Sequence, residues 1–225
     1  MKRTKLINRK LPDYTRGEEI FNMVSHIVGG GFGVIALVSC VIAAAIWGNA
    51  ARVVGGAIYG SAMILLYTMS SVYHGLKPEL AKKVMQVLDH CTIFFLIAGT
   101  YTPITLGPML DENPAMAWVV FGVEWGLAAL GITLNARDLK KYKVFSMICY
   151  LGMGWMIILS AIIAPIPLSF AGLMWLLAGG IAYTIGAVLY GLGKRIRYMH
   201  SVFHLFVLLG SILQYVSILL YVMMR

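Results

Sequence analysis

Charged residues are scarce in this sequence. Only 12% of its 225 residues are Asp, Glu, Lys or Arg, whereas 60% are hydrophobic, and the mean hydropathy is +0.83. A water-soluble domain of this size needs a larger share of polar residues to cover its surface. The scarcity of charge therefore excludes an ordinary soluble domain and predicts an integral membrane protein.

Acidic residues are scarcer than basic ones. Nine Asp and Glu stand against 18 Lys and Arg, which gives a formal net charge of +9. In a soluble protein this excess would suggest a nucleic-acid partner. Here the basic residues flank long hydrophobic runs, so membrane topology explains them better. We therefore expect membrane lipids as partners and no nucleic acid, while the oligomeric state stays open.

Cysteine is also rare. Cys40, Cys91 and Cys149 all fall within apolar runs and show no C-x-x-C spacing. We expect small buried side chains here rather than metal ligands or disulfides.

The N-terminal region does not have the pattern of a cleavable secretory signal. Residues 1–20 are hydrophilic and basic, whereas a signal passes quickly to a short apolar region and a cleavage site. We expect residues 1–20 to form an uncleaved cytoplasmic arm and residues 21–225 to form one transmembrane domain.

Long apolar runs are what the sequence has in abundance. A bilayer core takes about 20 apolar residues per helix. The sequence therefore predicts an all-α membrane protein, a bundle of seven transmembrane helices with short connections. The expected spans are approximately 22–47, 53–74, 85–106, 115–134, 144–163, 169–191 and 201–223. The stretch at 107–114 contains prolines and acids and is expected to be the turn between spans three and four.

The basic residues predict the orientation of these spans. Sixteen Lys and Arg lie in the arm and in the loops after spans two, four and six, whereas Arg52 and Arg225 lie on the opposite side. Cytoplasmic loops of membrane proteins are enriched in Lys and Arg. We therefore expect the N-terminus in the cytoplasm and the C-terminus outside.

The histidines all fall at the cytoplasmic ends of the predicted spans. They are His26, His74, His90, His200 and His204. A single histidine at a membrane interface is usually an amphipathic anchor. Five at one side, with none at the other, indicate a shared role instead.

A metal site is the role that their spacing favours. His200 and His204 share one helix face, because residues four apart differ by about 40° in direction. With a third imidazole from His74 they would form the ligand set of an open catalytic zinc site, three histidines and a water. Asp89 lies at the same level and could orient or deprotonate that water, and Ser70 lies one turn before His74.

Two further polar residues are not assigned to this site. His90 directly follows Asp89 and points roughly 100° away from it on a helix, so we interpret it as an interfacial anchor. Glu124 lies near the middle of span four, with no Lys or Arg at the same depth. It is either protonated and hydrogen-bonded to another helix, or part of a polar cavity.

The motifs resemble those of the hemolysin III family, the bacterial branch of the progestin and adipoQ receptor proteins. That branch is part of a larger group of seven-span metal-dependent hydrolases that includes alkaline ceramidases, and the resemblance covers essentially the whole chain. The matching stretches are EIFNMVSH with Glu19, Asn22, Ser25 and His26, SSVYH with Ser70 and His74, LDH with Asp89, and the H-x-x-x-H pair His200 and His204.

The resemblance implies a zinc ion (Zn2+) held by His74, His200 and His204, with Asp89 bonded to the metal-bound water and Ser70 close by. It also implies a ceramidase-like hydrolysis of a lipid amide or ester, a role in membrane-lipid homeostasis, and a multi-pass protein of the bacterial inner membrane. The family name implies cytolysis, but no spacing in this chain indicates a pore.

Glu19, Asn22 and His26 form a second group on one face of span one. We expect them to cap this span and to hydrogen-bond close to the metal rather than to act directly in catalysis. A fourth histidine ligand would close the metal site and argue against hydrolysis.

Two other functions stay open at this point. A receptor or sensor could use the same zinc only to hold spans two, three and seven together. A transporter or pore would need a continuous polar path, and the outer halves of the spans offer little beyond Glu124, Gln214 and scattered Ser, Thr and Tyr.

Overall fold

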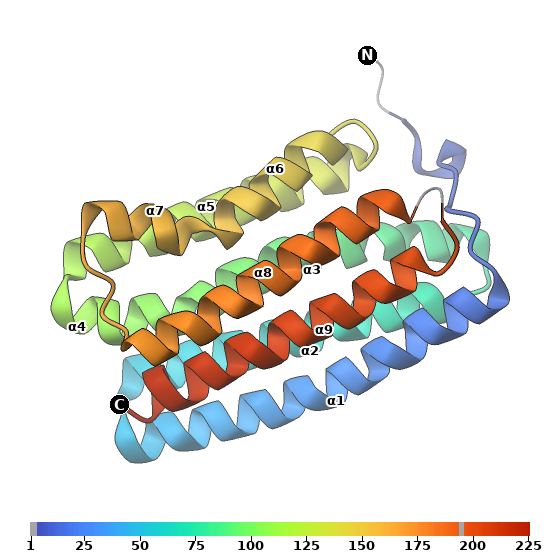
Figure 1. Ribbon diagram of the computed structural model, residues 1–225. Helices are drawn as coiled ribbons and strands as arrows, with labels where there is room; N and C mark the ends of the chain where they lie inside the picture. The colour runs from blue at the N-terminus through green and yellow to red at the C-terminus, as the bar shows by residue number, and fades with distance from the viewer. Residues whose placement is uncertain (1–3, 194–195) are drawn as a thin grey trace.

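The computed structural model describes residues 4–193 and 196–225, and within these ranges the chain is helical with no β-strand. The long helices lie side by side and form an elongated bundle (Figure 1). The long helices are α1 (Arg16–Trp47), α2 (Ala50–Gly75), α3 (Glu79–Ile104), α5 (Pro114–Asp138), α8 (Phe170–Leu192) and α9 (Met199–Ile218). Two shorter helices, α6 (Lys143–Gly154) and α7 (Met156–Ile163), follow each other between α5 and α8. The short elements are η1 (Leu6–Asn8), η2 (Thr105–Met109), α4 (Leu110–Glu112) and η3 (Leu219–Met223).

Six helical segments are long and apolar enough to cross a membrane, and the bent pair α6 and α7 makes a seventh if it is counted as one span. Large apolar side chains lie on the outside of the bundle, among them Ile27, Val38 and Ile42 at 56%, 51% and 53% exposure. Such surfaces are typical of helices that face lipid. The predicted all-α membrane fold is confirmed, while the side that each end faces stays a prediction.

Helix α1 begins at Arg16, six residues before the predicted start of span one. Thr15 caps it: its hydroxyl accepts from the N–H of Glu18 at 3.2 Å, and the Glu18 carboxylate accepts from the N–H of Thr15 at 2.8 Å. This reciprocal pair satisfies two N–H groups that a helix start leaves free. Residues 16–20 of the predicted arm therefore belong to the first helix, because a polar capping turn precedes the apolar run.

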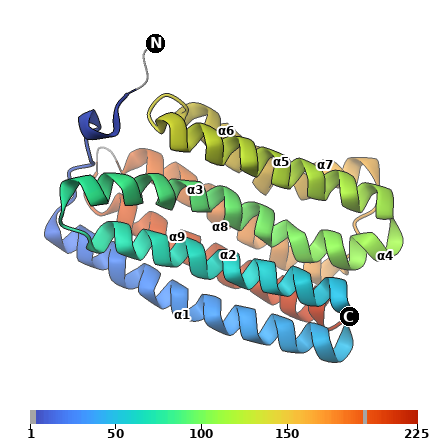
Figure 2. The ribbon, with the colours of Figure 1, turned by 180° about the vertical axis from the view of Figure 1, so that it is seen from behind.

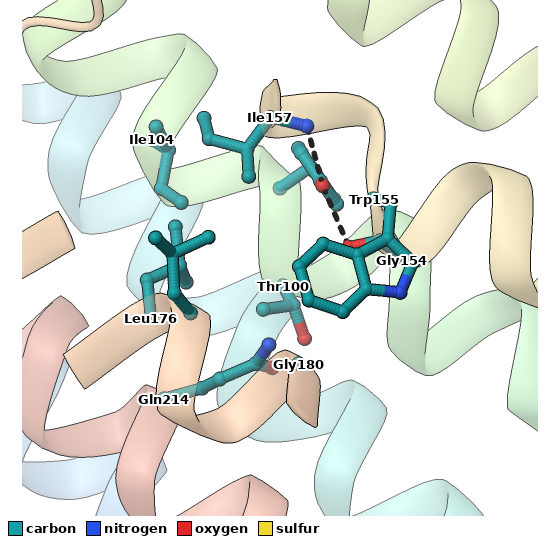
Figure 3. A pocket seen from close by; sticks show the side chains of 10 residues that line it. Thr100, Ile104, Gly154, Trp155, Ile157, Leu176, Gly180 and Gln214 are labelled. Atoms are coloured by element: carbon teal, nitrogen blue, oxygen red, sulfur yellow. Dashed lines mark hydrogen bonds between the residues drawn. The ribbon is translucent and has the colours of Figure 1, made fainter. Parts of the chain in front are cut away.

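The residues of predicted span five are helical, but in two pieces that meet at an angle of 49°. The hydroxyl of Tyr101, from α3, lies in the break: it donates to the carbonyl of Gly154 at 3.1 Å and accepts from the N–H of Ile157 at 2.9 Å (Figure 3). A side chain inserted into the helical hydrogen-bond ladder is a known cause of kinks. The sequence of span five does not reveal this bend because the inserted side chain comes from another helix.

The predicted turn at 107–114 is shorter than expected. Helix α3 continues through η2 and α4 to Glu112, with a kink at Gly107, where φ is −102° and ψ is −113°. The chain reverses at Asn113, whose side chain accepts from the N–H of Met116 at 3.1 Å, and Pro114 occupies the first turn of α5. Proline at this position fits a helix start, so the reversal needs a single residue.

Glycines let neighbouring helices approach closely. A Cβ atom on Gly60 of α2 would lie 2.3 Å from the Cα of Leu37 in α1, and one on Gly179 of α8 would lie 2.9 Å from the carbonyl oxygen of Gly210 in α9. Between apolar helices in lipid, close backbone packing is a main source of association. These contacts fix α1 against α2 and α8 against α9.

The start of α1, the end of α2, the start of α3 and the start of α9 lie at one end of the bundle, and the C-terminus lies at the other (Figures 1 and 2). The N-terminal arm also docks at the first of these ends. Lys83 donates to the carbonyl of Ile7 at 2.8 Å, and the N–H of Thr4 donates to Asp138 at 2.8 Å. The fold thus brings the helix ends that carry the predicted site together.

Candidate metal centre

Three of the histidines form a compact buried cluster. His74 lies in the last turn of α2, and His200 and His204 lie in the first two turns of α9. One ring nitrogen of each residue lies within 4.8 Å of the other two. The residues are 3%, 9% and 2% exposed, respectively. The structure therefore brings together the three residues predicted as metal ligands.

The two histidines of α9 point at a common position. Their Nε2 atoms are 3.1 Å apart. Ligand nitrogens at about 2.0–2.1 Å from a tetrahedral zinc ion would be about 3.3–3.4 Å apart. A slight widening of this pair is therefore enough for both rings to hold one ion.

His74 is oriented by a carboxylate of α1. Its Nδ1 atom lies 2.7 Å from Glu19, whose second carboxylate oxygen lies 2.9 Å from the ammonium group of Lys82. The Nε2 atom of His74 is buried and has no hydrogen-bond partner among the described residues. Metal-ligating histidines commonly donate their other N–H to a carboxylate. With its proton on Nδ1, His74 presents the free nitrogen that a metal requires.

Lys82 also closes the end of α2. Its ammonium group donates to the carbonyls of Tyr73, His74 and Leu76 at 2.9, 3.3 and 3.3 Å. The last carbonyls of a helix have no partner within the helix, so a lysine at this position satisfies them. A residue that the sequence pattern assigned only to membrane orientation thus fixes both Glu19 and the backbone of His74.

Asp89 and Ser70 lie beside each other at the edge of the histidine cluster. The Ser70 side chain lies near the Asp89 carboxylate, which is close enough to His74 to interact with it electrostatically. The Asp89 side chain is 16% exposed and is not one of the three residues whose ligand atoms lie within 4.8 Å of one another. Its carboxylate is therefore next to the ligand set and not part of it.

His90 contacts Asp89 instead of pointing away from it. Its Nδ1 atom lies 3.2 Å from the Asp89 carboxylate and 2.8 Å from the carbonyl of Gln86, and its Nε2 atom lies 3.4 Å from the hydroxyl of Tyr190. The prediction that His90 points away from Asp89 is therefore wrong, because the imidazole ring turns back toward the neighbouring carboxylate. His90 is still outside the three-histidine group.

Asn22 and His26 lie on α1 behind His204. The ring of His26 stacks on that of His204 with centroids 3.8 Å apart and planes 25° apart, and it meets Tyr67 edge-on at 4.9 Å. Within the part of the chain that the structure covers, the amide of Asn22 and both ring nitrogens of His26 are buried without a hydrogen-bond partner. Such atoms are rare in folded proteins and call for a specific explanation.

Tyr14 covers the cluster from the arm, and no motif in the sequence points to it. Its ring stacks on His200 with centroids 4.8 Å apart and planes 16° apart, and it lies 5.8 Å from the ring of His74. Burial, reinforced by the neighbouring Tyr190 and Asp89, raises the pKa of the Tyr14 phenol above its ordinary value. The side chain over the site is therefore uncharged at neutral pH.

Glu124 is a separate buried polar group. It is 0% exposed, and its carboxylate oxygens have no hydrogen-bond partner in residues 4–193 and 196–225. It interacts electrostatically with Tyr101, whose hydroxyl lies in the break between α6 and α7. The hydrogen bond to another helix that was one of the two expectations is therefore not formed among these residues.

The donor set suits zinc. Three imidazoles in a buried setting favour a borderline-soft ion, whereas magnesium and calcium prefer carboxylate and carbonyl oxygens. Three protein ligands also leave one tetrahedral position for a water or a substrate atom. The residues present therefore fit a zinc ion with one open position.

Comparison with known proteins identifies the family. The sequence profile described as Haemolysin-III related matches residues 14–215. The Hemolysin-3 homolog of Bacillus subtilis (strain 168) is 36% identical over 208 residues, which cover 92% of this chain and 96% of that protein. Hemolysin-3 of Bacillus cereus is also 36% identical over 208 residues, 92% of each chain.

A more distant relative is human. The monocyte to macrophage differentiation factor of Homo sapiens is 29% identical over 172 residues, 72% of this chain and 67% of that protein. No solved structure matches the chain significantly. The human relative supports the link to the wider receptor group.

A bundle of apolar membrane-spanning helices with buried histidines gathered at one end defines an integral membrane protein with a candidate metal centre. The chain belongs to the haemolysin-III-related family. The resemblance expected from the motifs is thereby confirmed.

Proposed function

We propose that this protein is a zinc-dependent hydrolase of lipid amide or ester bonds, acting at the cytoplasmic face of a bacterial inner membrane. His74, His200 and His204 would hold the zinc. The observation that carries the proposal is the convergence of three buried imidazole nitrogens, from α2 and α9, within 4.8 Å. Lipids are the molecules that surround a site within a membrane-spanning bundle. Membrane lipids are therefore the proposed substrates, and lipid homeostasis is the proposed role.

The chain's own residues supply proton handling and orientation. A zinc ion in a three-histidine site supplies activation of water and polarisation of a carbonyl. Asp89 would accept a proton from a water beside the cluster, and the nearby Ser70 hydroxyl would help to hold its carboxylate in position. Glu19 keeps His74 turned with Nε2 toward the cluster.

The cytoplasmic placement rests on the basic residues. The arm that docks beside the site carries Lys5, Arg9 and Lys10, and the loop after α2 carries Lys77. Such residues favour the cytoplasmic side of a membrane. A carbonyl of the inner leaflet would then lie at the depth of the histidines.

A receptor or sensor with a structural zinc is the second candidate. It is favoured by the stacking of Tyr14 on His200, which covers the cluster and leaves His200 9% exposed. In that role the ion would hold α2 and α9 together without turning over a lipid. Such a protein would melt at a lower temperature after zinc removal.

Lipid turnover by the purified, zinc-loaded chain tests the proposal. A ceramide and a phospholipid, each in mixed micelles, offer an amide and an ester, and released fatty acid is measured by mass spectrometry. We expect release that is lost after chelation and restored by added zinc. The Asp89→Asn variant should keep its zinc and lose turnover, because it retains the shape of the side chain but not its basicity.

A zinc-loaded protein that releases fatty acid from neither lipid, and that melts earlier after chelation, would contradict hydrolysis and support the structural role. A protein that binds no zinc would contradict both candidates. Unchanged turnover in Asp89→Asn would contradict the proposed role of Asp89 in proton transfer. It would not contradict the metal site.

A further inference from the structure

One short segment contacts every histidine of the cluster. Residues 14–26 comprise Tyr14 and the first turns of α1, and three of their side chains each meet a different ligand. These pairs are Tyr14 with His200, Glu19 with His74, and His26 with His204. The three candidate ligands come from α2 and α9, so α1 is a support that they share.

The contact of Tyr14 fixes the plane of a ring. Its phenol lies nearly parallel to the His200 imidazole, with an angle of 16° between the planes. Stacking of this kind restricts rotation of the imidazole about its Cβ–Cγ bond. Such a rotation would turn Nε2 away from the cluster. Tyr14 thus favours the orientation in which His200 and His204 face each other.

The contact of α1 with His204 has the same effect on the other side. His26 stacks on the His204 ring, and the backbone of Asn22 lies against that ring. The Nδ1 atom of His204 is buried and, among the residues described, has no hydrogen-bond partner. A metal held at Nε2 places the proton on Nδ1, and that proton requires an acceptor. The backbone of Asn22, which lies against this ring, is the group on this side that can supply the acceptor.

Glu18 joins the start of this segment to the start of α9. One of its carboxylate oxygens accepts from the N–H of Tyr198 at 2.8 Å, and the other accepts from the N–H of Thr15 at 2.8 Å and lies 3.4 Å from Arg197. Tyr198 directly precedes α9 and has a φ of 60°. A carboxylate that is 3% exposed therefore connects the two helix starts two residues before His200.

We propose that residues 14–26 are a positioning segment for the metal ligands, so that docking of this segment and zinc binding stabilise each other. The inference rests on the zinc site proposed above and adds to it Tyr14, Asn22 and Glu18. Coupling between two binding events is reciprocal. The docked segment raises zinc affinity by the same factor by which bound zinc favours docking.

Replacement of Glu18 tests the coupling without removing any group that touches the three histidines. Residues that support metal ligands typically change metal affinity by about 10–100-fold. We expect Glu18→Ala to weaken zinc binding by about 10-fold, measured by competition with a chelator on the full chain in detergent micelles. Glu18→Gln should lose less, because its amide oxygen can still accept from Tyr198.

Ser169→Ala is the matched control. Ser169 caps α8 by accepting from the N–H of Gly172 at 3.2 Å, so its loss also removes a helix cap. This cap lies at the end of the bundle opposite to the histidines (Figure 1). We expect the control to lower the melting temperature and to leave zinc affinity unchanged.

Two further measurements distinguish an effect on the position of the ligands from an effect on the general stability of the protein. The absorption spectrum of the cobalt-substituted protein should change in Tyr14→Leu and stay the same in Tyr14→Phe, because phenylalanine keeps the stacked ring. Amide hydrogen exchange of residues 14–26 should slow when zinc is added to the wild type. In Glu18→Ala this effect of zinc should shrink.

Three results would overturn the inference. If the wild type binds zinc and the Glu18 and Tyr14 variants bind it equally well, the segment does not position the ligands, and the zinc site itself stands. If zinc leaves exchange of residues 14–26 unchanged, the reciprocal coupling is absent. If the wild type binds no zinc, the proposed function fails and this inference fails with it. If Glu18→Ala does not fold, the comparison of Tyr14→Leu with Tyr14→Phe tests whether the segment positions the ligands.

Discussion

The two ends of the bundle both bury polar side chains, but they satisfy them differently. At the end opposite to the histidines, Arg52 of α2 is 8% exposed and donates to Asp111 at 2.6 Å and to the carbonyl of Arg225. Arg225 lies 3.2 Å from Glu112. Apart from the Nε of Arg52, which has no partner in the described ranges, these charges meet opposite charges or carbonyls.

At the histidine end, buried polar atoms are left unpaired instead. Within the described chain they include Nε2 of His74, Nδ1 of His204, both ring nitrogens of His26 and the amide of Asn22. Each such atom costs about 1–3 kcal/mol if nothing satisfies it. The paired charges at the first end hold helices together, whereas the unpaired polar atoms at the histidine end are typical of a binding site.

The largest expected effect is the loss of a candidate ligand. His74→Ala, His200→Ala and His204→Ala should each reduce bound zinc from about one ion per chain to almost none, because two imidazoles make a poor site. Metal content is measured by mass spectrometry after dialysis against a weak chelator. His90→Ala should keep its zinc, and retention of zinc in all three cluster variants would contradict the site.

Removal of the carboxylate behind His74 should have the next largest effect. Glu19→Ala leaves all three imidazoles in place but removes the hydrogen bond to Nδ1, and we expect zinc affinity to fall by about 10–100-fold. Glu79→Ala is a matched control at the same end, where Glu79 forms an ion pair with Lys83 at 2.6 Å and is 74% exposed. Equal zinc affinities in the two variants would contradict the role of Glu19.

A change at the opposite end should separate stability from metal binding. Asp111→Ala removes the partner of Arg52, and we expect the free energy of unfolding to fall by about 1–2 kcal/mol, a moderate value because Asp111 is 45% exposed. Thermal or denaturant melting in micelles measures this loss. Zinc affinity should not change, and a parallel loss of zinc would show that the two ends are not independent.

Glu124→Gln should have the smallest effect. The carboxyl group has no partner in the residues described, so a neutral side chain of the same shape should change stability by less than about 1 kcal/mol. Melting and zinc titration of the same sample check both properties. A large loss in either would show that Glu124 belongs to a further functional site.

Periodicity and topology predicted that the histidines gather at one end of the bundle, and the family resemblance singled out His74, His200 and His204 among them. The four-residue spacing of His200 and His204 fixes their common helix face, and the alternating direction of the spans brings His74 to the same end. Ser70 and Asp89 follow from the same two rules. The spacing along one helix and the alternating direction of successive spans can both be read from the sequence, so these placements were predictable.

Contacts that depend on how helices and the arm pack were not predictable in this way. Tyr14 is one aromatic residue in a polar arm, and its stacking on His200 depends on where the arm docks. The bend at Trp155 depends on Tyr101 of another helix, and the contact of Glu18 with Tyr198 joins the starts of α1 and α9, which are far apart in the sequence. None of these has a local sequence signal.

X-ray absorption at the zinc edge of the purified protein tests the central claim most directly. We expect a zinc ion with about three imidazole nitrogens at about 2.0–2.1 Å and one further light atom from water or substrate. Protein purified without zinc that does not take it up, a shell of four histidines, or sulfur at about 2.3 Å would contradict the site described above.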